Sequence, residues 1–318
     1  MLKTGRIDLI KTKYVSYIML QSVIYGVGNP LTKVAYESIT PFWLLTFRFS
    51  IALVIFFLFF GKQIISQLRT AKVSQYLPAS LCMALAYITC NLALNWTSAT
   101  NVGFLMSLPV IFTPLLAIFI LHQKYDFRFL PLQIIVVIGL YLLCSNEGGL
   151  ILNKGDIFAL ITAIALSGAL VFGKKSLESL DAVTISATQV GVTAFMSIVC
   201  ALIFDDFSIV PNIAPAAWGV IIYLALTCTC IAYVLQNSAL VRLSSNTVSM
   251  LQCIQPILTA VCSFIILGET MSIRGVLGGL IIISAILVVN LLETNEKTDK
   301  ATKNGDKDYI GKSLGAEI

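Results

Sequence analysis

Ten separate stretches of about 17 to 22 mostly apolar residues follow one another along this chain of 318 residues, with short polar breaks between them. A helix needs about 20 apolar residues to cross the hydrocarbon core of a bilayer, which is about 30 Å thick. The composition fits that solvent, because 58% of the residues are hydrophobic and 12% are charged, against about a quarter charged in soluble domains. The sequence therefore predicts an integral membrane protein embedded in a lipid bilayer.

The predicted fold is an all-α polytopic membrane protein with ten transmembrane helices. Long, separate apolar runs are typical of helices, whereas a membrane β-barrel has alternating segments of about ten residues. The polar tail, residues 293–318, is expected to be disordered and cytoplasmic. The ten predicted helices cover Tyr14–Ala35, Pro41–Phe60, Tyr76–Trp96, Asn101–Leu121, Phe129–Cys144, Gly155–Gly173, Ala182–Phe204, Pro215–Asn237, Thr247–Leu267 and Ile273–Leu292.

Basic residues gather in every second segment between the apolar runs. With the N-terminus inside, the inside segments hold most of the 21 Lys and Arg residues, and the positive-inside rule then places both termini in the cytoplasm. The short loops fit the cytoplasmic membrane of a cell. The same bias accounts for the net charge of +5. No basic patch is interleaved with aromatic residues, so no nucleic-acid partner is expected.

The second half of the chain repeats the first. The matched positions are Ser98 with Ser245 and Pro109 with Pro256 at a spacing of 147 residues, and Gly26 with Gly168 and Lys33 with Lys175 at a spacing of 142 residues. Each half holds five predicted spans, an odd number, so the second half must enter the membrane in the opposite direction. Inverted repeats suit alternating access, in which two half-bundles rock about a central site. A duplication kept only for packing is the alternative.

These residues resemble the EamA branch of the drug/metabolite transporter (DMT) superfamily over about residues 17–292. The resemblance rests on Tyr25-Gly-Val-Gly-Asn-Pro-Leu-Thr-Lys33, Arg48, Pro109, Gly155-Asp156, Gln189, Pro256 and Gly268-Glu269. Tyr25 stands where the family usually has Trp, and Leu121-His122-Gln123 stands where it usually has a Gly-Glu pair. The resemblance implies two EamA repeats, over residues 14–146 and 154–292. It also implies a carrier, commonly an exporter of amino acids or other small metabolites, with a cavity lined mainly by the first, third, fourth, sixth, eighth and ninth spans.

Polar side chains inside the apolar runs are the candidate substrate ligands, because polar groups in hydrocarbon are costly unless they face a watery cavity or one another. In the third run they recur at every fourth position, which places them on one helix face. Amides and phenols without fixed charge suit an uncharged or zwitterionic small molecule. Hydrogen bonding between helices, worth about 0.6 kcal/mol per contact, is the alternative. The candidate substrate-binding residues are Tyr25, Asn29, Arg48, Tyr87, Asn91, Asn95, Gln189, Tyr233, Asn237, Gln252 and Gln255.

Arg48 is the one charged residue well inside a predicted span, about 10 Å deep at about 1.5 Å per residue. It either extends to the interface or pairs with a carboxylate or a substrate anion. Proline removes a helical hydrogen bond, so Pro30, Pro109 and Pro256 are predicted to be hinges or static kinks. No Asp or Glu lies deep in any span, which disfavours a buried proton relay.

Enzymatic function is not expected. The sequence has no HExxH, GxSxG or P-loop motif and a single histidine, and its eight cysteines lack paired CxxC spacing. No metal or cofactor is therefore predicted. The expected function is a carrier that exports a small polar metabolite, an amino acid or similar. A lipid-like or nucleotide-sugar-type substrate, a channel and a non-transporting membrane protein remain alternatives. The small-xxx-small pattern at Gly275–Gly279 leaves a homodimer open.

Overall fold

A computed structural model describes residues 2–122, 127, 130–144, 153–269, 273–285 and 287–288, with side chains from residue 12 onward except at residues 143 and 144. Within these ranges the chain is helical and contains no β-strand. The predicted polar tail lies outside them. The elements are α1 (Leu2–Ala35), α2 (Pro41–Thr70), η1 (Val73–Gln75), α3 (Leu77–Trp96), α4 (Ala99–Leu105), α5 (Pro109–Leu121), α6 (Leu130–Cys144), α7 (Lys154–Ser176), α8 (Ala182–Phe204), η3 (Phe207–Asn212), α9 (Pro215–Tyr223), η4 (Leu224–Ile231), α10 (Ala232–Arg242), α11 (Ser245–Gln252) and α12 (Gln255–Leu267).

Seven helical segments of the described chain are long and apolar enough to cross a membrane, against the ten predicted. They are Pro41–Thr70, Leu77–Trp96, Ala99–Leu121, Lys154–Ser176, Ala182–Phe204, Pro215–Arg242 and Ser245–Leu267. Two further apolar helices, Leu130–Leu142 and Ile273–Ala285, are shorter. The helix α1 is 34 residues long, but polar residues such as Gln21 and Asn29 lower its hydropathy. Multi-pass helical architecture is thus confirmed, and the count of ten is not.

Several helices extend beyond their predicted ends. The helix α2 continues to Thr70, ten residues past Phe60, and α10 continues to Arg242, five past Asn237. The α2 extension is rich in polar residues and the α10 extension ends at Arg242, and Lys, Gln and Arg are good helix formers. Hydropathy therefore locates the apolar part of a helix, whereas the helix itself ends where the backbone turns.

Two of the predicted spans are broken helices. The first consists of α4 and α5, and the second consists of α11 and α12. Pro109 begins α5 and Pro256 is the second residue of α12. Proline is tolerated in a first helical turn because its missing N–H has no intrahelical partner there. The breaks therefore lie at two of the three prolines singled out in the sequence, whereas Pro30 lies inside the unbroken helix α1.

The eighth predicted span is continuous but irregular. Between α9 and α10, residues Leu224–Ile231 form a π-helix, labelled η4. Thr229 Oγ1 donates to the Leu224 carbonyl five residues earlier, at 3.0 Å. Such π segments are rare and occur often at functional sites. No feature of the sequence analysis predicted this one.

The ends of the helices repeat at constant spacing in the two halves. Thr40 and Asp181, 141 residues apart, are the N-caps of α2 and α8. His122 and Gly268, 146 residues apart, are the left-handed C-caps of α5 and α12, with φ of 51° and 67°. These spacings are each one residue shorter than the sequence matches suggested. The helix ends therefore give the spacing between equivalent residues of the two halves.

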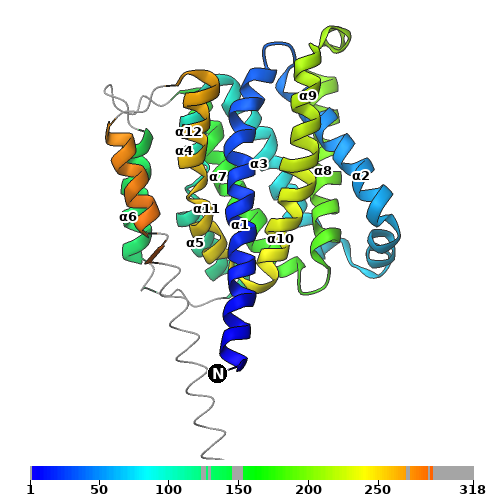
Figure 1. Cartoon of the computed structure of the whole chain (residues 1–318). Coiled ribbons are helices and arrows are strands. Elements are labelled where there is room, and N and C mark those ends of the chain that lie inside the picture. The colour runs from blue at the N-terminus through cyan, green and yellow to red at the C-terminus, as the bar shows by residue number, and fades with distance from the viewer. Residues whose placement is uncertain are drawn as a thin grey trace, which may run out of the picture.

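Helix packing follows the same repeat. The helix α1 of the first half packs against α12 and α10 of the second half, and its equivalent α7 packs against α5 and α3 of the first half. The helices α2 and α8, which occupy equivalent places, pack against each other. In Figure 1, α1 crosses the middle of the bundle, with α2 and α8 on one side and α6 at the opposite edge. The bundle thus pairs each helix with elements of the other half.

Large apolar side chains cover the outside of the bundle. Leu58 and Phe59 are each 76% exposed and Ile265 is 73% exposed. Contiguous apolar surface of this kind is unusual on soluble monomers and fits contact with lipid. The polar residues of the apolar helices lie mainly inside, where the candidate site is found.

Candidate substrate cavity

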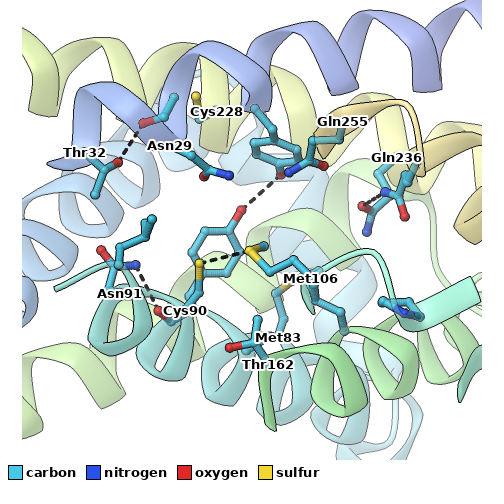
Figure 2. A pocket seen from close by; sticks show the side chains of 18 of the residues that line it. Asn29, Thr32, Met83, Cys90, Asn91, Met106, Thr162, Cys228, Gln236 and Gln255 are labelled. Carbon is cyan, nitrogen blue, oxygen red and sulfur yellow. Dashed lines mark hydrogen bonds between the residues drawn. The ribbon is translucent and has the colours of Figure 1, made fainter. Parts of the chain in front are cut away.

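A cavity lies between the helices at the centre of the bundle. It spans about 850 Å³ of space, counted with any part open to the outside. In Figure 2, Asn29, Gln255, Cys90 and Met106 converge on this space from different elements. The lining residues are Tyr25, Gly28, Asn29, Thr32, Arg48, Met83, Ala86, Tyr87, Cys90, Asn91, Leu94, Met106, Ser107, Pro109, Thr162, Leu166, Leu170, Leu224, Cys228, Gln236, Ser249, Gln252 and Gln255. They come from the six predicted spans and, through Arg48, from α2.

Arg48 is buried beside the cavity, with 4% of its surface exposed. Its Nε donates to Thr229 Oγ1 at 2.8 Å, and Nη2 donates to the Cys228 carbonyl at 3.3 Å. Both acceptors belong to the π-helix η4, which thereby orients the guanidinium. The guanidinium carbon also lies 4.9 Å from the Tyr87 ring centroid, a cation–π distance. Arg48 therefore faces the interior and does not extend to the interface.

Two tyrosines and an asparagine continue the polar wall beyond Arg48. The Tyr87 hydroxyl donates to the Tyr25 hydroxyl at 3.1 Å. Asn91 Oδ1 accepts from the Tyr36 hydroxyl at 2.6 Å, and Asn91 Nδ2 donates to the Tyr87 carbonyl at 2.9 Å. The Asn91 amide is thus held in place by protein groups. Asn29, one helical turn after Tyr25, has a buried Nδ2 without a partner in the described chain.

Three glutamines from three helices form a second polar cluster. Gln21 Nε2 donates to Gln236 Oε1 at 2.7 Å. Gln252 Nε2 donates to Gln236 Oε1 at 2.9 Å and to Gln21 Oε1 at 3.2 Å. Gln236 and Gln252 line the cavity, and their bonds join α10, α11 and α1. Gln21 was missed in the sequence, although a glutamine in an apolar run is the same signal that selected Gln252.

Four of the predicted site residues lie away from the cavity lining. Asn95 is exposed near the end of α3. Asn237 Nδ2 donates to Gln189 Oε1 and Ser186 Oγ, both at 2.9 Å, which ties α10 to α8. Tyr233 is 1% exposed and packs on Phe49 and Tyr87. In this conformation, Gln189 and Asn237 act as interhelical hydrogen-bonding groups, the alternative considered in the sequence analysis.

The cavity residues and the residues packed away from it are related by the repeat. Arg48 and Gln189 are 141 residues apart, as are the N-caps of their helices. Tyr87 and Tyr233 are 146 residues apart, and their ring centroids lie 5.7 Å from each other. Asn91 and Asn237 have the same spacing of 146 residues. The first-half member of each pair lines the cavity, whereas the second-half member is closed off by direct contacts.

Comparison with known proteins identifies the family. The EamA-like transporter family matches the chain twice, over residues 12–145 and 153–291. The chain belongs to the EamA-like transporter family. An uncharacterized transporter from Archaeoglobus fulgidus is 24% identical over 277 residues, covering 86% of this chain and 84% of that protein. The uncharacterized transporter YcxC of Bacillus subtilis is 22% identical over 299 residues, covering 90% and 93%.

A solved crystal structure supports the fold of this EamA-family chain. It matches with a TM-score of 0.73 at 15% sequence identity, covering 88% of this chain and 97% of the solved one. At that identity the likeness concerns the fold alone. The family match and the membrane helices together establish a multi-pass membrane transporter.

Polar clamps join the helices of the EamA bundle at both of its ends. Where α2 begins, Thr40 Oγ1 donates to the Asp205 carboxylate at the end of α8. Where α8 begins, the Asp181 carboxylate accepts from Gln63 and Gln67 of α2. The two clamps follow from the antiparallel packing of equivalent helices. Both are closed in this structure.

Asp181 lies outside the spans and has a shifted pKa. Burial acts to raise the pKa of this carboxyl group, but hydrogen bonds from Thr184, Gln63 and Gln67 outweigh it. The pKa of Asp181 therefore lies below its ordinary value. The Asp181 Oδ1 atom also accepts from the Thr184 N–H at 2.7 Å, which caps the start of α8.

Cations and one carboxylate close the remaining helix ends. Lys33 Nζ donates to the Thr97 carbonyl at 2.9 Å, where α3 ends. Lys174 Nζ donates to the Leu243 carbonyl at 3.1 Å, where α10 ends. Lys174, 141 residues after Lys33, thus takes the place that the sequence match gave to Lys175. Glu269 accepts from the Ala99 N–H at 3.3 Å, a favourable position for a carboxylate at the start of α4.

Proposed function

We propose that this protein is a carrier of the cytoplasmic membrane that moves a small polar metabolite by alternating access, in the export direction. The observation that supports it best is the central polar cavity, which is built from both structural repeats. Carriers with inverted repeats bind substrate near the midplane, where the two halves meet and where helices are discontinuous. Here Pro109 and Gln255, which begin the half-helices α5 and α12, both line the cavity.

The proposed topology has ten crossings in two inverted repeats of five, over residues 14–146 and 154–292, with both termini in the cytoplasm. The seven long spans, together with α1 and the two shorter apolar helices, supply helices for these crossings. The distribution of Lys and Arg supports the orientation. The opposed directions of α2 and α8, whose ends meet at the two clamps, support the inversion of the second half.

The closed state of both clamps supports a rocking mechanism. Thr40 with Asp205 and Asp181 with Gln67 hold α2 and α8 together at opposite ends. A carrier that opens to one side must release one clamp and keep the other. The observed conformation, with both closed, corresponds in this mechanism to an intermediate between the two open states. The substrate would enter after one clamp has opened.

Counterflow in proteoliposomes tests the proposed function. The purified full chain is reconstituted in vesicles preloaded with unlabelled pools of amino acids or other small metabolites, and uptake of labelled members is followed. Saturable uptake that requires a matching internal solute is the expected result. Asn91→Ala, at the cavity, should change the half-saturating concentration, whereas Asn212→Ala, on the exposed η3 segment, should not. Absence of exchange from every pool, with folded and inserted protein, would refute the carrier function.

A further inference from the structure

The cavity contains a buried positive charge that has no acidic partner among the residues of its lining. Arg48 lines the cavity, and only 4% of its surface is exposed. Among the described residues, its recorded hydrogen bonds use Nε and one Nη2 proton, and both acceptors are uncharged. A guanidinium carries five N–H donors, so three remain for a ligand. A buried charge without a counter-charge is costly, and an anionic ligand would remove that cost.

Two other residues of the cavity lining also offer hydrogen-bond donors. Asn29 Nδ2 is buried and has no acceptor within the described chain. The Tyr25 hydroxyl accepts from Tyr87, which leaves its own proton to donate. Gly28, next to Asn29, lets α1 approach η4 closely, because a Cβ atom at this position would lie 2.7 Å from the sulfur of Cys228. The helix α1, which carries Asn29, therefore packs directly on the segment that holds Arg48.

Helix ends of opposite polarity meet at the two breaks beside the cavity. The 13-residue helices α5 and α12 start at Pro109 and Gln255, and both residues line the cavity. The N-terminus of a helix carries about half a positive elementary charge and favours negative ligand groups. The same two starts follow the helix breaks described above. The C-terminal ends of α4 and α11 lie at the same breaks and carry the opposite partial charge, so Arg48 is the group that decides the sign of the ligand charge.

The lining offers no negative group for a cationic ligand. Within the described part of the chain, the residues around the cavity include Arg48 but no Asp or Glu. A zwitterion would bring an ammonium group into a space with a fixed positive charge and without a carboxylate partner. An anion would bring only the charge that the cavity favours.

We propose that the substrate is a small organic acid of net negative charge, whose carboxylate binds Arg48 with additional hydrogen bonds from Asn29 and Tyr25. This inference rests on the proposed carrier function and narrows its substrate class. The uncharged glutamine cluster, with Gln236 and Gln252 at the lining, then contacts the polar remainder of the molecule. Arg48 is suited to this role because a guanidinium binds a carboxylate through two parallel N–H donors.

Matched compounds that differ only in charge test the proposal. Each series has one side chain and four head groups, so that size and shape stay nearly constant. The isobutyl series consists of 2-hydroxyisocaproate, leucine, 2-hydroxyisocaproamide and leucinamide, which are an anion, a zwitterion, a neutral molecule and a cation. Methyl and benzyl series are built in the same way. Counterflow and ligand-induced thermal stabilisation of the full chain are measured for every compound.

The hydroxy acid of at least one series is expected to be exchanged. It should also stabilise the protein at a concentration at least tenfold lower than its amide or its amino acid requires. Removing a charged hydrogen-bond partner weakens binding by roughly tenfold to a hundredfold. Arg48→Gln should therefore abolish the preference for the hydroxy acid, and Arg48→Lys should retain part of it. Arg242→Gln is the matched control, because Arg242 is exposed and lies outside the lining.

The outcomes separate this inference from the proposed function. Exchange of amino acids or amides in preference to the hydroxy acids would overturn the anionic substrate and leave the carrier intact. Failure of every compound and of every pool in the counterflow experiment would overturn both. If Arg48→Gln does not fold, the charge series on the unaltered protein still decides between the head groups, and Arg48→Lys tests the residue.

Discussion

Gly26→Ala is expected to weaken the contact between the two halves of the bundle. A Cβ atom added at Gly26 would lie 2.6 Å from Leu258 Cβ and 3.2 Å from the Leu258 carbonyl carbon. Ordinary contacts of such atoms begin near 3.4 Å, so α1 and α12 must separate by about 0.8 Å or distort. Overpacking of this kind costs about 1–3 kcal/mol. The higher helix propensity of Ala offsets about 1 kcal/mol of that cost.

Comparison with Gly219→Ala separates the cost of overpacking between α1 and α12 from the gain in helix propensity. Gly219 lies in α9, and an added Cβ there meets nothing within 4 Å, so that variant reports helix propensity alone. The difference in unfolding free energy between the two variants should be about 1–3 kcal/mol, with Gly26→Ala the less stable. The assay is reversible unfolding of the purified protein in mixed detergent micelles, followed by circular dichroism.

A second substitution tests the cause. Leu258→Gly removes the Cβ atom that Gly26→Ala would meet, so the double variant should show a favourable coupling energy relative to the two single variants. Equal stability changes in Gly26→Ala and Gly219→Ala would refute the argument that α1 and α12 are in contact at this point. So would a double variant whose effects simply add.

Three other predictions concern the site and the clamps. Tyr233→Phe should leave stability unchanged or raise it by about 1 kcal/mol, because the buried Tyr233 hydroxyl has no partner in the described chain. Tyr87→Phe loses a hydrogen bond to Tyr25 and should lower stability. The reverse order of the two variants in thermal unfolding would contradict this. Asp181→Asn should flatten the acid-induced loss of stability. The lowered pKa of Asp181 gives stability that is present above the ordinary carboxyl pKa and lost as the pH falls through the folded-state value; identical pH profiles for the variant and the parent would count against the clamp. Pro256→Ala should change the transport rate more than the amount of folded protein, and an equal loss of both would indicate a static kink.

Most of the helices and the two breaks could be predicted from the sequence, because apolar length and proline act locally. Bilayer thickness fixes the length of an apolar run, and proline cannot donate a backbone hydrogen bond. Pro109 and Pro256 lie at the breaks, whereas Pro30 and Pro114 lie inside continuous helices, so a proline marks where a break can occur and does not by itself produce one. Helix ends were less predictable: α2 extends to Thr70 through polar residues that hydropathy excludes but helix propensity allows.

The cavity was only partly predictable, because polar residues in apolar helices have two uses. Arg48 and Tyr87 line the cavity, and Gln189 and Tyr233, at the equivalent places, do not. The same signal selected all four. Tyr87 and Tyr233 are the same residue type at equivalent positions, so the local sequence does not tell which of the two lines the cavity. The π-helix η4, which supplies the acceptors for Arg48, has no local sequence signal that we recognise.

The difference between Arg48 and Gln189 has a consequence for the concentration dependence of transport at the two faces of the membrane. The repeat places a full charge in one half and a neutral amide in the other. A carrier whose halves exchange conformations would present an anion with unlike binding strengths at its two faces, without altering the final equilibrium distribution. Such a passive carrier has a different half-saturating concentration on each side of the membrane. The solute level at which it works inside the cell could then be set independently of the level at which it works outside.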